Sequence, residues 1–293
     1  MNINKCPVCN ETKFKPALIC KDYTVSKEDF YIVTCESCSF NFTNPRPDNS
    51  VLGNYYKSED YISHSNTKKG IISQLYHAVR NYTLKKKIQL VSKHVSRGTI
   101  LDYGCGTGMF LKVCQDNGWK AFGMEPDEGA AKIGSQMGLT VFPDKVKLNE
   151  YTNSQKFDAI TLWHVLEHVT DLGDTLNFFR ARLNDKGVLI IAVPNHKSFD
   201  SQYYKEFWAA YDVPRHLYHF QPQTIEKLLN RFDFKLAEML PMKFDSFYVS
   251  MLSEKYKTGS IKYLSAFING LRSNLKAKNA GEYSSVIYVF KKK

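Results

Sequence analysis

Three closely spaced glycines constrain this chain more than any other sequence feature. Gly104, Gly106 and Gly108 stand between a short apolar run, Thr99 to Asp102, and an apolar stretch that begins at Met109. The run has the composition of a strand and the stretch that of a helix, so the order is strand, glycine loop, helix. Glycines let the backbone approach a ligand closely, and a helix N-terminus favours a negative group. We therefore expect an α/β domain that binds a nucleotide-type ligand at this loop.

The glycine spacing differs from that of dinucleotide-binding loops. Such loops place a third glycine three residues after the second, where this chain has Met109. A second expected strand, residues 121–124, ends at Glu125, which lies 23 residues after Asp102. An acid at this position can accept hydrogen bonds from both ribose hydroxyls. The loop therefore predicts a nucleoside ligand other than NAD.

Four cysteines near the N-terminus form two C-x-x-C pairs, Cys6 with Cys9 and Cys35 with Cys38. Four thiolates complete a tetrahedral zinc shell. A segment this short buries too little apolar surface to fold alone, so the metal would supply folding free energy. A redox dithiol is the alternative, but it would need only one such pair beside a βαβ unit. We predict a zinc ribbon.

Composition and charge narrow the class of protein. The chain is 43% hydrophobic and 24% charged, which is typical of a globular protein. Its net charge of +11 gathers at residues 1–98 and 241–293, and the middle is mildly acidic. These basic flanks could attract an anionic partner such as RNA, a nucleotide-linked sugar or a lipid surface; the alternative is that the lysines are merely solvated. With no apolar run of membrane-spanning length and no secretory signal in view, we expect a cytoplasmic protein.

Four segments in the same order resemble class I S-adenosylmethionine (SAM)-dependent methyltransferases. Residues 101–108 resemble their glycine loop, residues 123–127 their second strand end, residues 157–169 their fourth strand and the helix after it, and residues 188–195 their fifth strand. The resemblance covers roughly residues 99–240. It implies an α/β fold with a Rossmann-like seven-stranded sheet and helices on both faces. The zinc ribbon and the methyltransferase-like segments together resemble a bacterial subgroup of these enzymes that methylates sugars and other small molecules.

The resemblance also implies which residues hold the cofactor, SAM. They are Asp102 near the amino-acid moiety; Gly104, Gly106 and Gly108 along the methionine and ribose; Glu125 at the ribose; Asp144 at the adenine amine; and Leu162 and Trp163 near the sulfonium.

Histidines supply the candidates for a general base. Ligands of parallel α/β sheets bind beyond the carboxyl ends of the strands, and His164 and His196 come directly after the expected fourth and fifth strands. A neutral imidazole can accept the proton of a hydroxyl or of an enolisable carbon. We expect His164 nearest the chemistry, with His196 as the fallback and His216 and His219 acting from a lid. For each, a packing role is the alternative.

His164, Glu167 and His168 have the spacing of one helix face. Ubiquinone-pathway O-methyltransferases resemble this stretch but carry an acid at position 164, and there the cluster is implicated in magnesium binding. Because imidazole is a softer ligand than a carboxylate, we do not expect a second metal here.

The chain divides into three predicted parts: a zinc ribbon at 1–44, a linker and helical segment at 45–98, and a methyltransferase domain at 99–293 with a helical insertion at about 244–280. Within this insertion, residues 255–275 are predicted to form one basic helix. The long connection at 195–223, rich in aromatic residues, is typical of a lid or binding loop.

These observations predict a SAM-dependent methyltransferase acting on a small molecule, anionic in one interpretation, such as a sugar or another cell-envelope precursor. An rRNA methyltransferase and a non-catalytic SAM-binding or zinc-mediated interaction protein are the alternatives. The acceptor atom and the oligomeric state stay open.

Overall fold

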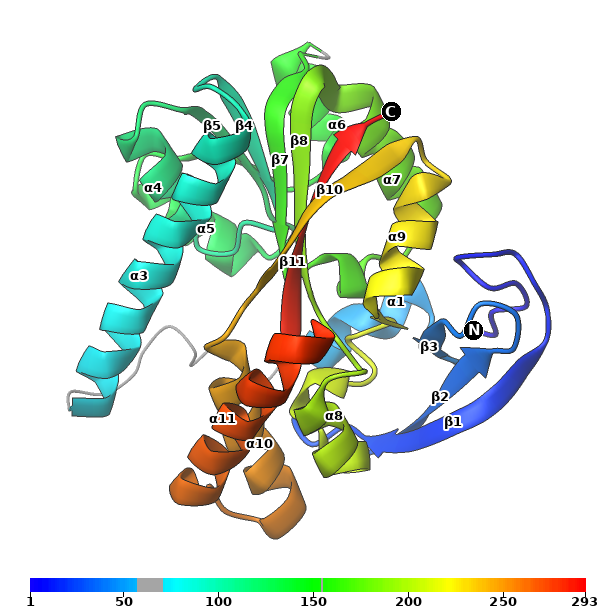
Figure 1. The fold of residues 1–293 in the computed structure, drawn as a ribbon. Coiled ribbons are helices and arrows are strands. Elements are labelled where there is room, and N and C mark those ends of the chain that lie inside the picture. Colours follow the sequence, from blue (N-terminus) through cyan, green and yellow to red (C-terminus); the bar gives the residue numbers. More distant parts are fainter. Residues whose placement is uncertain (57–70, 154) are drawn as a thin grey trace.

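Two β-sheets organise the protein, whose computed structural model describes residues 1–56, 71–153 and 155–293 (Figure 1). The larger sheet has seven strands, which confirms the predicted α/β class. Five of its strands are parallel, and β11 runs antiparallel to both of its neighbours. In spatial order the strands are β10 (Phe234–Pro241), β11 (Ser285–Lys292), β8 (Leu183–Pro194), β7 (Phe157–Trp163), β4 (Thr99–Tyr103), β5 (Lys120–Met124) and β6 (Thr140–Phe142).

Helices cover both faces of this sheet, so its central strands are apolar throughout rather than alternating. Residues 187–194 of β8 are all buried. One face packs against α3 (Ile71–His94) and α4 (Met109–Asp116). The opposite face packs against α6 (Lys145–Thr152), α7 (Leu172–Arg182) and α9 (Pro222–Asn230), and α5 (Glu128–Gln136) connects β5 to β6.

Three segments gather at the edge of the sheet where the parallel strands end. Pro194 at the end of β8 pairs with Ser285 at the start of β11, and Pro241 at the end of β10 pairs with Val286. The connection after β8 and the insertion between β10 and β11 therefore begin at this carboxyl edge. The third segment is the N-terminal one, which Figure 1 shows beside them. The fold thus concentrates its irregular parts where ligands of such sheets bind.

The second sheet joins the N-terminal segment to the rest of the chain. It contains β1 (Phe14–Lys21), β2 (Asp29–Cys35), β3 (Asn41–Thr43) and β9 (Tyr218–His219). Strand β9 belongs to the connection after β8, and it pairs with β3 through Asn41 to His219 and Phe42 to Tyr218. Phe42 is fully buried in the same apolar cluster as the large sheet. The N-terminal segment therefore shares a core with the methyltransferase-like part, and the predicted division at residue 44 stays a prediction.

The connection at 195–223 has more structure than a loop. It contains α8 (Phe199–Tyr204) and two short 3₁₀ helices, Lys205–Phe207 and Ala209–Tyr211, before β9. Its aromatic residues Tyr204, Trp208 and Tyr211 are buried together. These three aromatic side chains therefore pack in a common apolar cluster.

The insertion also differs from its prediction as one helix at 255–275. It folds into two helices, α10 (Asp245–Thr258) and α11 (Tyr263–Ala280), which pack side by side. The break falls at Gly259, whose φ of +79° ends α10 in the left-handed region that glycine tolerates.

Within the described part of the chain, no helix is both long enough and apolar enough to cross a membrane. Two further short helices, α1 (Asn49–Leu52) and a 3₁₀ turn at Gly53–Tyr56, come after the N-terminal sheet.

Candidate functional site

The glycine loop leaves β4 and enters α4 at the carboxyl edge of the sheet, as its sequence predicts. Gly104 and Gly106 have φ angles of +73° and +54°. A Cβ at Gly104 would lie 2.6 Å from the Val165 side chain, so close packing requires this glycine. A Cβ at Gly106 would meet nothing within 4 Å. Gly106 therefore borders open space, and a ligand can reach its backbone there.

Glu125 lies directly against this loop. Its Oε2 accepts a hydrogen bond of 2.8 Å from the Gly106 N–H, and its Oε1 accepts one of 2.9 Å from the Asp127 N–H. Burial raises the pKa of Glu125, although these two N–H donors oppose the shift. Each carboxylate oxygen keeps a second lone pair, so the side chain can still accept hydrogen bonds from a diol. The structure thus brings together the loop and the acid that the sequence paired.

The side chain of Asp102 is buried more completely than contact with a ligand would require. It is 2% exposed at the end of β4, and its Oδ1 accepts a 2.7 Å hydrogen bond from Thr161 Oγ1 on the neighbouring strand β7. Burial raises the pKa of Asp102 to about 7, against the opposing effects of Thr161 and of the Lys87 ammonium. This carboxyl group therefore links β4 to β7, and it lies near the end of β4, just before the glycine loop.

The two residues predicted at the sulfonium point in different directions. Leu162 is fully buried in the sheet core. Trp163 is half-buried and packs edge-on against Phe110, with 5.4 Å between ring centroids. The Nζ of Lys87, on α3, lies 4.3 Å from the centroid of the Trp163 ring. Burial lowers the pKa of Lys87, while Asp102 and Asp245 favour its charge. The ammonium of Lys87 and the ring of Trp163 thus form a cation–π contact at the end of the site where the sulfonium was predicted.

Asp144, predicted at the adenine amine, caps α6. Its Oδ1 accepts a 2.8 Å hydrogen bond from the Lys147 N–H, and the residue is exposed. One oxygen therefore has a local structural role. The adenine contact stays a prediction.

His164 lies in a cluster of charged side chains rather than on a helix face. Its φ is +59°, and only a short 3₁₀ turn, Leu166–His168, comes after it, so the predicted common helix face is wrong. Its Nε2 lies 2.9 Å from Asp245 Oδ2, and its Nδ1 lies 3.4 Å from Glu167 Oε1. Burial lowers the pKa, but the two carboxylates outweigh it and raise the pKa of His164 to about 10. The imidazole is therefore positively charged near pH 7, and the expectation of a neutral base does not fit this residue.

Glu167 connects this charged cluster to two more imidazoles. It is fully buried, and neither of its oxygens has a hydrogen bond to any described residue. His168 and His216 lie close by, with 4.5 Å between their ring centroids. Their Nδ1 atoms contact the backbone carbonyls of Arg215 and Ala210 at 3.1 and 2.9 Å. One ligand atom from Glu167, His168 and His216 lies within 4.8 Å of each of the others, so this set has the chemistry and spacing to hold a cation.

His196 and His219 are both buried at the carboxyl edge of the large sheet, His196 directly after β8 and His219 in β9. Burial lowers the pKa of His196 to about 4, and its Nε2 has no hydrogen-bond partner in the described part of the chain. His219 lies in β9, where its Nε2 is 3.2 Å from Thr43 Oγ1, and burial holds its pKa well below the usual value. His219 thus joins the second sheet to the connection after β8. The charges of His196 and His216 lower the pKa of His219 further, so these three predicted base candidates lie near one another.

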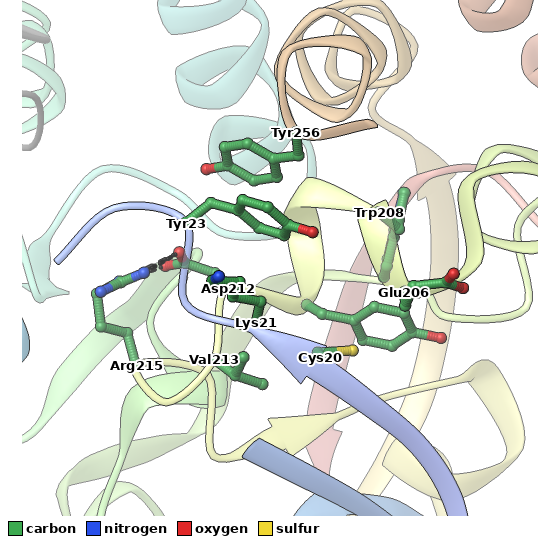
Figure 2. A pocket seen from close by; sticks show the side chains of 10 residues that line it. Cys20, Lys21, Tyr23, Glu206, Trp208, Asp212, Val213, Arg215 and Tyr256 are labelled. Atoms are coloured by element: carbon green, nitrogen blue, oxygen red, sulfur yellow. Dashed lines mark hydrogen bonds and ion pairs between the residues drawn. The ribbon is translucent and has the colours of Figure 1, made fainter. Parts of the chain in front are cut away.

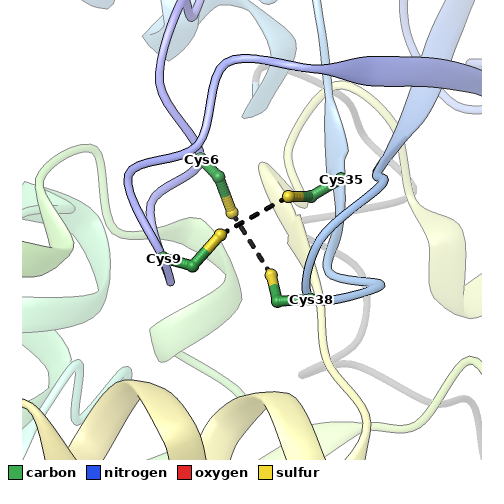
Figure 3. Close-up of side chains that lie close together, drawn as sticks. All are labelled: Cys6, Cys9, Cys35 and Cys38. Atoms are coloured by element: carbon green, nitrogen blue, oxygen red, sulfur yellow. Dashed lines mark hydrogen bonds between the residues drawn. The ribbon is translucent and has the colours of Figure 1, made fainter.

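The four N-terminal cysteines converge, as Figure 3 shows. The Sγ atoms of Cys6 and Cys38 are 3.5 Å apart, as are those of Cys9 and Cys35. All four lie within 4.8 Å of one another, and all are free thiols. Four sulfurs at about 2.3 Å from a tetrahedral zinc ion would be about 3.8 Å apart. The donor set and its spacing therefore fit zinc.

A small recess opens between the end of β1, the connection after β8 and α10 (Figure 2). Tyr23 stacks on Tyr256 at one side, with 4.5 Å between ring centroids. At the other side the buried guanidinium of Arg215 donates hydrogen bonds to Asp212 and, at 3.0 Å, to Asp22 Oδ1. This ion pair ties the N-terminal segment to the connection that carries His216.

Sequence reasoning did not assign a site role to Lys87, Asp245 or Glu167. Lys87 lies on α3 and Asp245 is 81 residues from His164, so no local motif marks either of them. Glu167 carried a signal, since it is an acid inside the apolar stretch between His164 and His168. Buried acids are rarely left unpaired, which makes such a position a candidate for a site.

Comparison with known proteins agrees with this geometry. The ubiquinone biosynthesis O-methyltransferase of Rhodopseudomonas palustris is 26% identical over 156 residues, which make up 50% of this chain and 62% of that protein. The enzyme of the same name from Haemophilus ducreyi is 31% identical over 125 residues, 39% of this chain and 51% of that one. The match thus spans less than two thirds of the length of these relatives.

A solved structure shares the fold at lower sequence identity. Magnesium protoporphyrin IX methyltransferase from Synechocystis PCC 6803, with bound SAH, aligns with a TM-score of 0.55 and 14% identity, covering 84% of this chain and all of that one. The family model described as a methyltransferase domain matches residues 76–239. Because this match spans more than half of the chain and the seven-stranded sheet agrees with it, the chain belongs to the methyltransferase domain family.

Proposed function

We propose that this protein transfers the methyl group of SAM to a small-molecule acceptor. The observation that carries this proposal is the hydrogen bond from the Gly106 N–H to Glu125. It places an acid with free lone pairs beside the part of the glycine loop that borders open space. That pair suits a nucleoside whose ribose contacts Glu125 and whose remaining part lies along the loop. SAM, once bound, supplies an electrophilic methyl group, so the chain's own task is to align an acceptor with it.

The acceptor class is supported by the relatives. The curated proteins are methyltransferases of ubiquinone biosynthesis, and the structural relative is named for a porphyrin. We infer a small molecule on this basis. The finer class, a sugar or another cell-envelope precursor, rests on the resemblance of the N-terminal zinc ribbon to the bacterial small-molecule subgroup.

Within this proposal His164 acts through its positive charge, because its two ring nitrogens already face Asp245 and Glu167. Because Asp245 and Glu167 keep it protonated near pH 7, it would stabilise negative charge on the acceptor rather than remove its proton. A neutral imidazole is a suitable base for an acceptor that needs one. The pKa of His168 is lowered to about 4 by burial, so that ring is neutral, although its Nδ1 already contacts Tyr56 and Arg215.

For the N-terminal segment we propose a structural zinc site at Cys6, Cys9, Cys35 and Cys38, supported by the sulfur spacing. The metal would fix two loops at the end of the second sheet. We further propose that residues 1–44 form the ribbon, 45–98 the linker and helical segment, and 99–293 the catalytic part with its insertion.

Calorimetric titration with S-adenosylhomocysteine tests the cofactor assignment. We expect binding by the wild type, no binding of NAD, and an affinity at least tenfold lower in Glu125→Ala, since a hydrogen bond to a charged acceptor contributes about 1.5–3 kcal/mol. Glu128→Ala, at an exposed acid on the neighbouring helix, is the matched control and should bind normally. Tighter binding of NAD, or equal affinity in Glu125→Ala, would contradict the assignment.

Transfer from radiolabelled SAM then tests the acceptor. The protein is incubated separately with nucleotide-linked sugars, with phenolic quinone precursors and with ribosomal RNA. Label in a small-molecule fraction supports the proposal, and label in the sugar fraction supports its finer form. Label in RNA alone would replace it, and cofactor binding with no transfer to any fraction would favour a non-catalytic protein.

A further inference from the structure

Helix α11 presents its large apolar side chains to solvent and its small ones to the protein. The residues it buries are Ala266, Asn269, Gly270, Ser273 and Ala277. The exposed fractions of Leu264, Phe267 and Leu275 are 74%, 57% and 51%. Helices on the surface of a protein normally have the opposite arrangement, with the large apolar residues facing the core.

The inward face is small because α10 comes very close. A Cβ at Gly270 would lie 2.7 Å from the Phe247 ring and 3.0 Å from its Cα. Ser246 Oγ donates a hydrogen bond of 3.1 Å to the Gly270 carbonyl. The packing of α11 against α10 thus fixes its orientation, and the apolar face is held outward rather than left there by loose docking.

The outward face forms a continuous stripe. Its apolar members succeed one another at intervals of one, three and four residues, which places them on one side of a helix. They are Leu264, Phe267, Ile268, Leu271 and Leu275, all exposed, with Tyr263 at the start. A contiguous exposed apolar surface of this kind marks an interaction site rather than ordinary surface composition.

Basic side chains flank this stripe, whereas the acids that accept hydrogen bonds from α11, Glu254 and Asp200, are buried against its inner face. Residues 255–281 contain six lysines and arginines and no aspartate or glutamate. Lys262, Arg272 and Lys278 are exposed. The Nζ of Lys276 lies 4.2 Å from the Phe199 ring centroid and so turns toward α8. The surface therefore combines an apolar stripe with the exposed basic side chains of Lys262, Arg272 and Lys278.

The combination of an apolar stripe and basic side chains decides which partner can bind this surface of α11. A second copy of the chain, meeting this one through the same face, would oppose its basic side chains to those of this one, which is repulsive. An anionic lipid surface matches both properties, because acyl chains accept the apolar stripe and headgroup phosphates accept the lysines and arginines. We propose that α11 docks the protein on an anionic membrane surface, lying in the interface without crossing the bilayer.

The position of α11 gives this docking a consequence for the site. Its partner α10 begins at Asp245, the residue that pairs with His164. Figure 1 shows both helices beyond the carboxyl edge of the sheet. A membrane at α11 would thus face the same end of the molecule as the proposed acceptor site. The docking proposal itself rests on the surface alone and stands whether or not the proposed methyl transfer holds.

Co-sedimentation with phospholipid vesicles tests the proposal. Wild-type protein is mixed with vesicles of phosphatidylcholine alone and of phosphatidylcholine with 30% phosphatidylglycerol in 0.1 M NaCl. We expect partition onto the anionic vesicles at least tenfold above that onto the neutral ones, falling several-fold in 0.5 M NaCl because salt screens the attraction.

Two variants identify the surface. Leu264→Ser/Phe267→Ser should lose at least tenfold in partition, and Arg272→Glu/Lys278→Glu should lose the preference for anionic vesicles. Ile133→Ser/Val146→Ser removes exposed apolar side chains from α5 and α6 and should bind as the wild type does. Circular dichroism and the melting temperature show that each variant is folded. Absent binding, equal binding to neutral vesicles, unchanged binding of Leu264→Ser/Phe267→Ser, or a dimer that this variant dissociates would overturn the proposal.

Discussion

The Nε2 of His164 lies 2.9 Å from Oδ2 of Asp245, although 81 residues separate the two in the chain. This contact joins the end of β7 to the first residue of α10, so the insertion between β10 and β11 contributes directly to the charged cluster around His164. Glu167 faces the other ring nitrogen at 3.4 Å. Two carboxylates around one imidazole favour its positively charged form and raise the pKa of His164 to about 10, which does not fit a neutral base near pH 7.

The stability of the protein should report this charge. The pKa of His164 rises from 6.5 to about 10 on folding, so its stabilising contribution is complete below pH 6.5 and is lost as the pH rises toward 10. In His164→Asn, whose side chain tolerates the positive φ, the melting temperature should fall most at pH 6–6.5 and least at pH 10. Scanning calorimetry of both proteins from pH 6 to pH 10 measures the difference. A deficit independent of pH would show that His164 is not an ion-pair partner.

We predict one zinc ion per chain, bound by the four N-terminal cysteines. Elemental analysis of protein purified without chelator should give a ratio of one, and Cys6→Ser/Cys38→Ser should lose the metal. Cys20→Ser, which changes a buried thiol outside the cluster, should keep it. Because Phe40 and Phe42 pack in the core of the large sheet, metal loss should also lower the melting temperature of the whole chain. Equal zinc in the double variant and the wild type would rule out this site.

Loss of Arg215 should destabilise the protein strongly. Its guanidinium and the Asp22 carboxylate are 1% and 0% exposed, so Arg215→Met would leave a buried charge unpaired. Breaking such a pair costs about 3–5 kcal/mol. Urea denaturation should show this loss, and Asp22→Asn/Arg215→Met should recover part of it. The exposed pair of Lys112 and Asp116 is the control, and Lys112→Met should cost less than about 1 kcal/mol. A small effect of Arg215→Met would mean that the connection carrying it does not hold the N-terminal segment.

Lys87 offers a test of the cofactor end of the site. Its ammonium lies over the Trp163 ring and near Asp102, where a bound amino acid would present a carboxylate. Lys87→Met should therefore weaken S-adenosylhomocysteine binding by about tenfold, as expected for one charge-assisted hydrogen bond. Lys86→Met, at the exposed neighbouring position, should bind normally. Unchanged calorimetric affinity in Lys87→Met would place the cofactor carboxylate elsewhere.

Local sequence determined much of this protein. The three glycines, the strand before them and Glu125 are close in sequence, and each has one physical role that its residue type dictates, so both the loop and the α/β class could be predicted. The convergence of the four cysteines could be predicted in the same way, because two C-x-x-C pairs leave few alternatives to a tetrahedral metal site.

Only the tertiary structure decided what surrounds the candidate base. His164 looked like a neutral histidine at a strand end, and its charge depends on Asp245 from a distant helix and on Glu167 held in a short 3₁₀ turn rather than on a helix face. A pKa is set by the neighbours in space, and sequence spacing does not give them. The same holds for β9, whose pairing with β3 joins residues 41–42 to 218–219 and merges the predicted ribbon with the core. Long-range pairing depends on which surfaces can be buried together, a property of the folded chain as a whole.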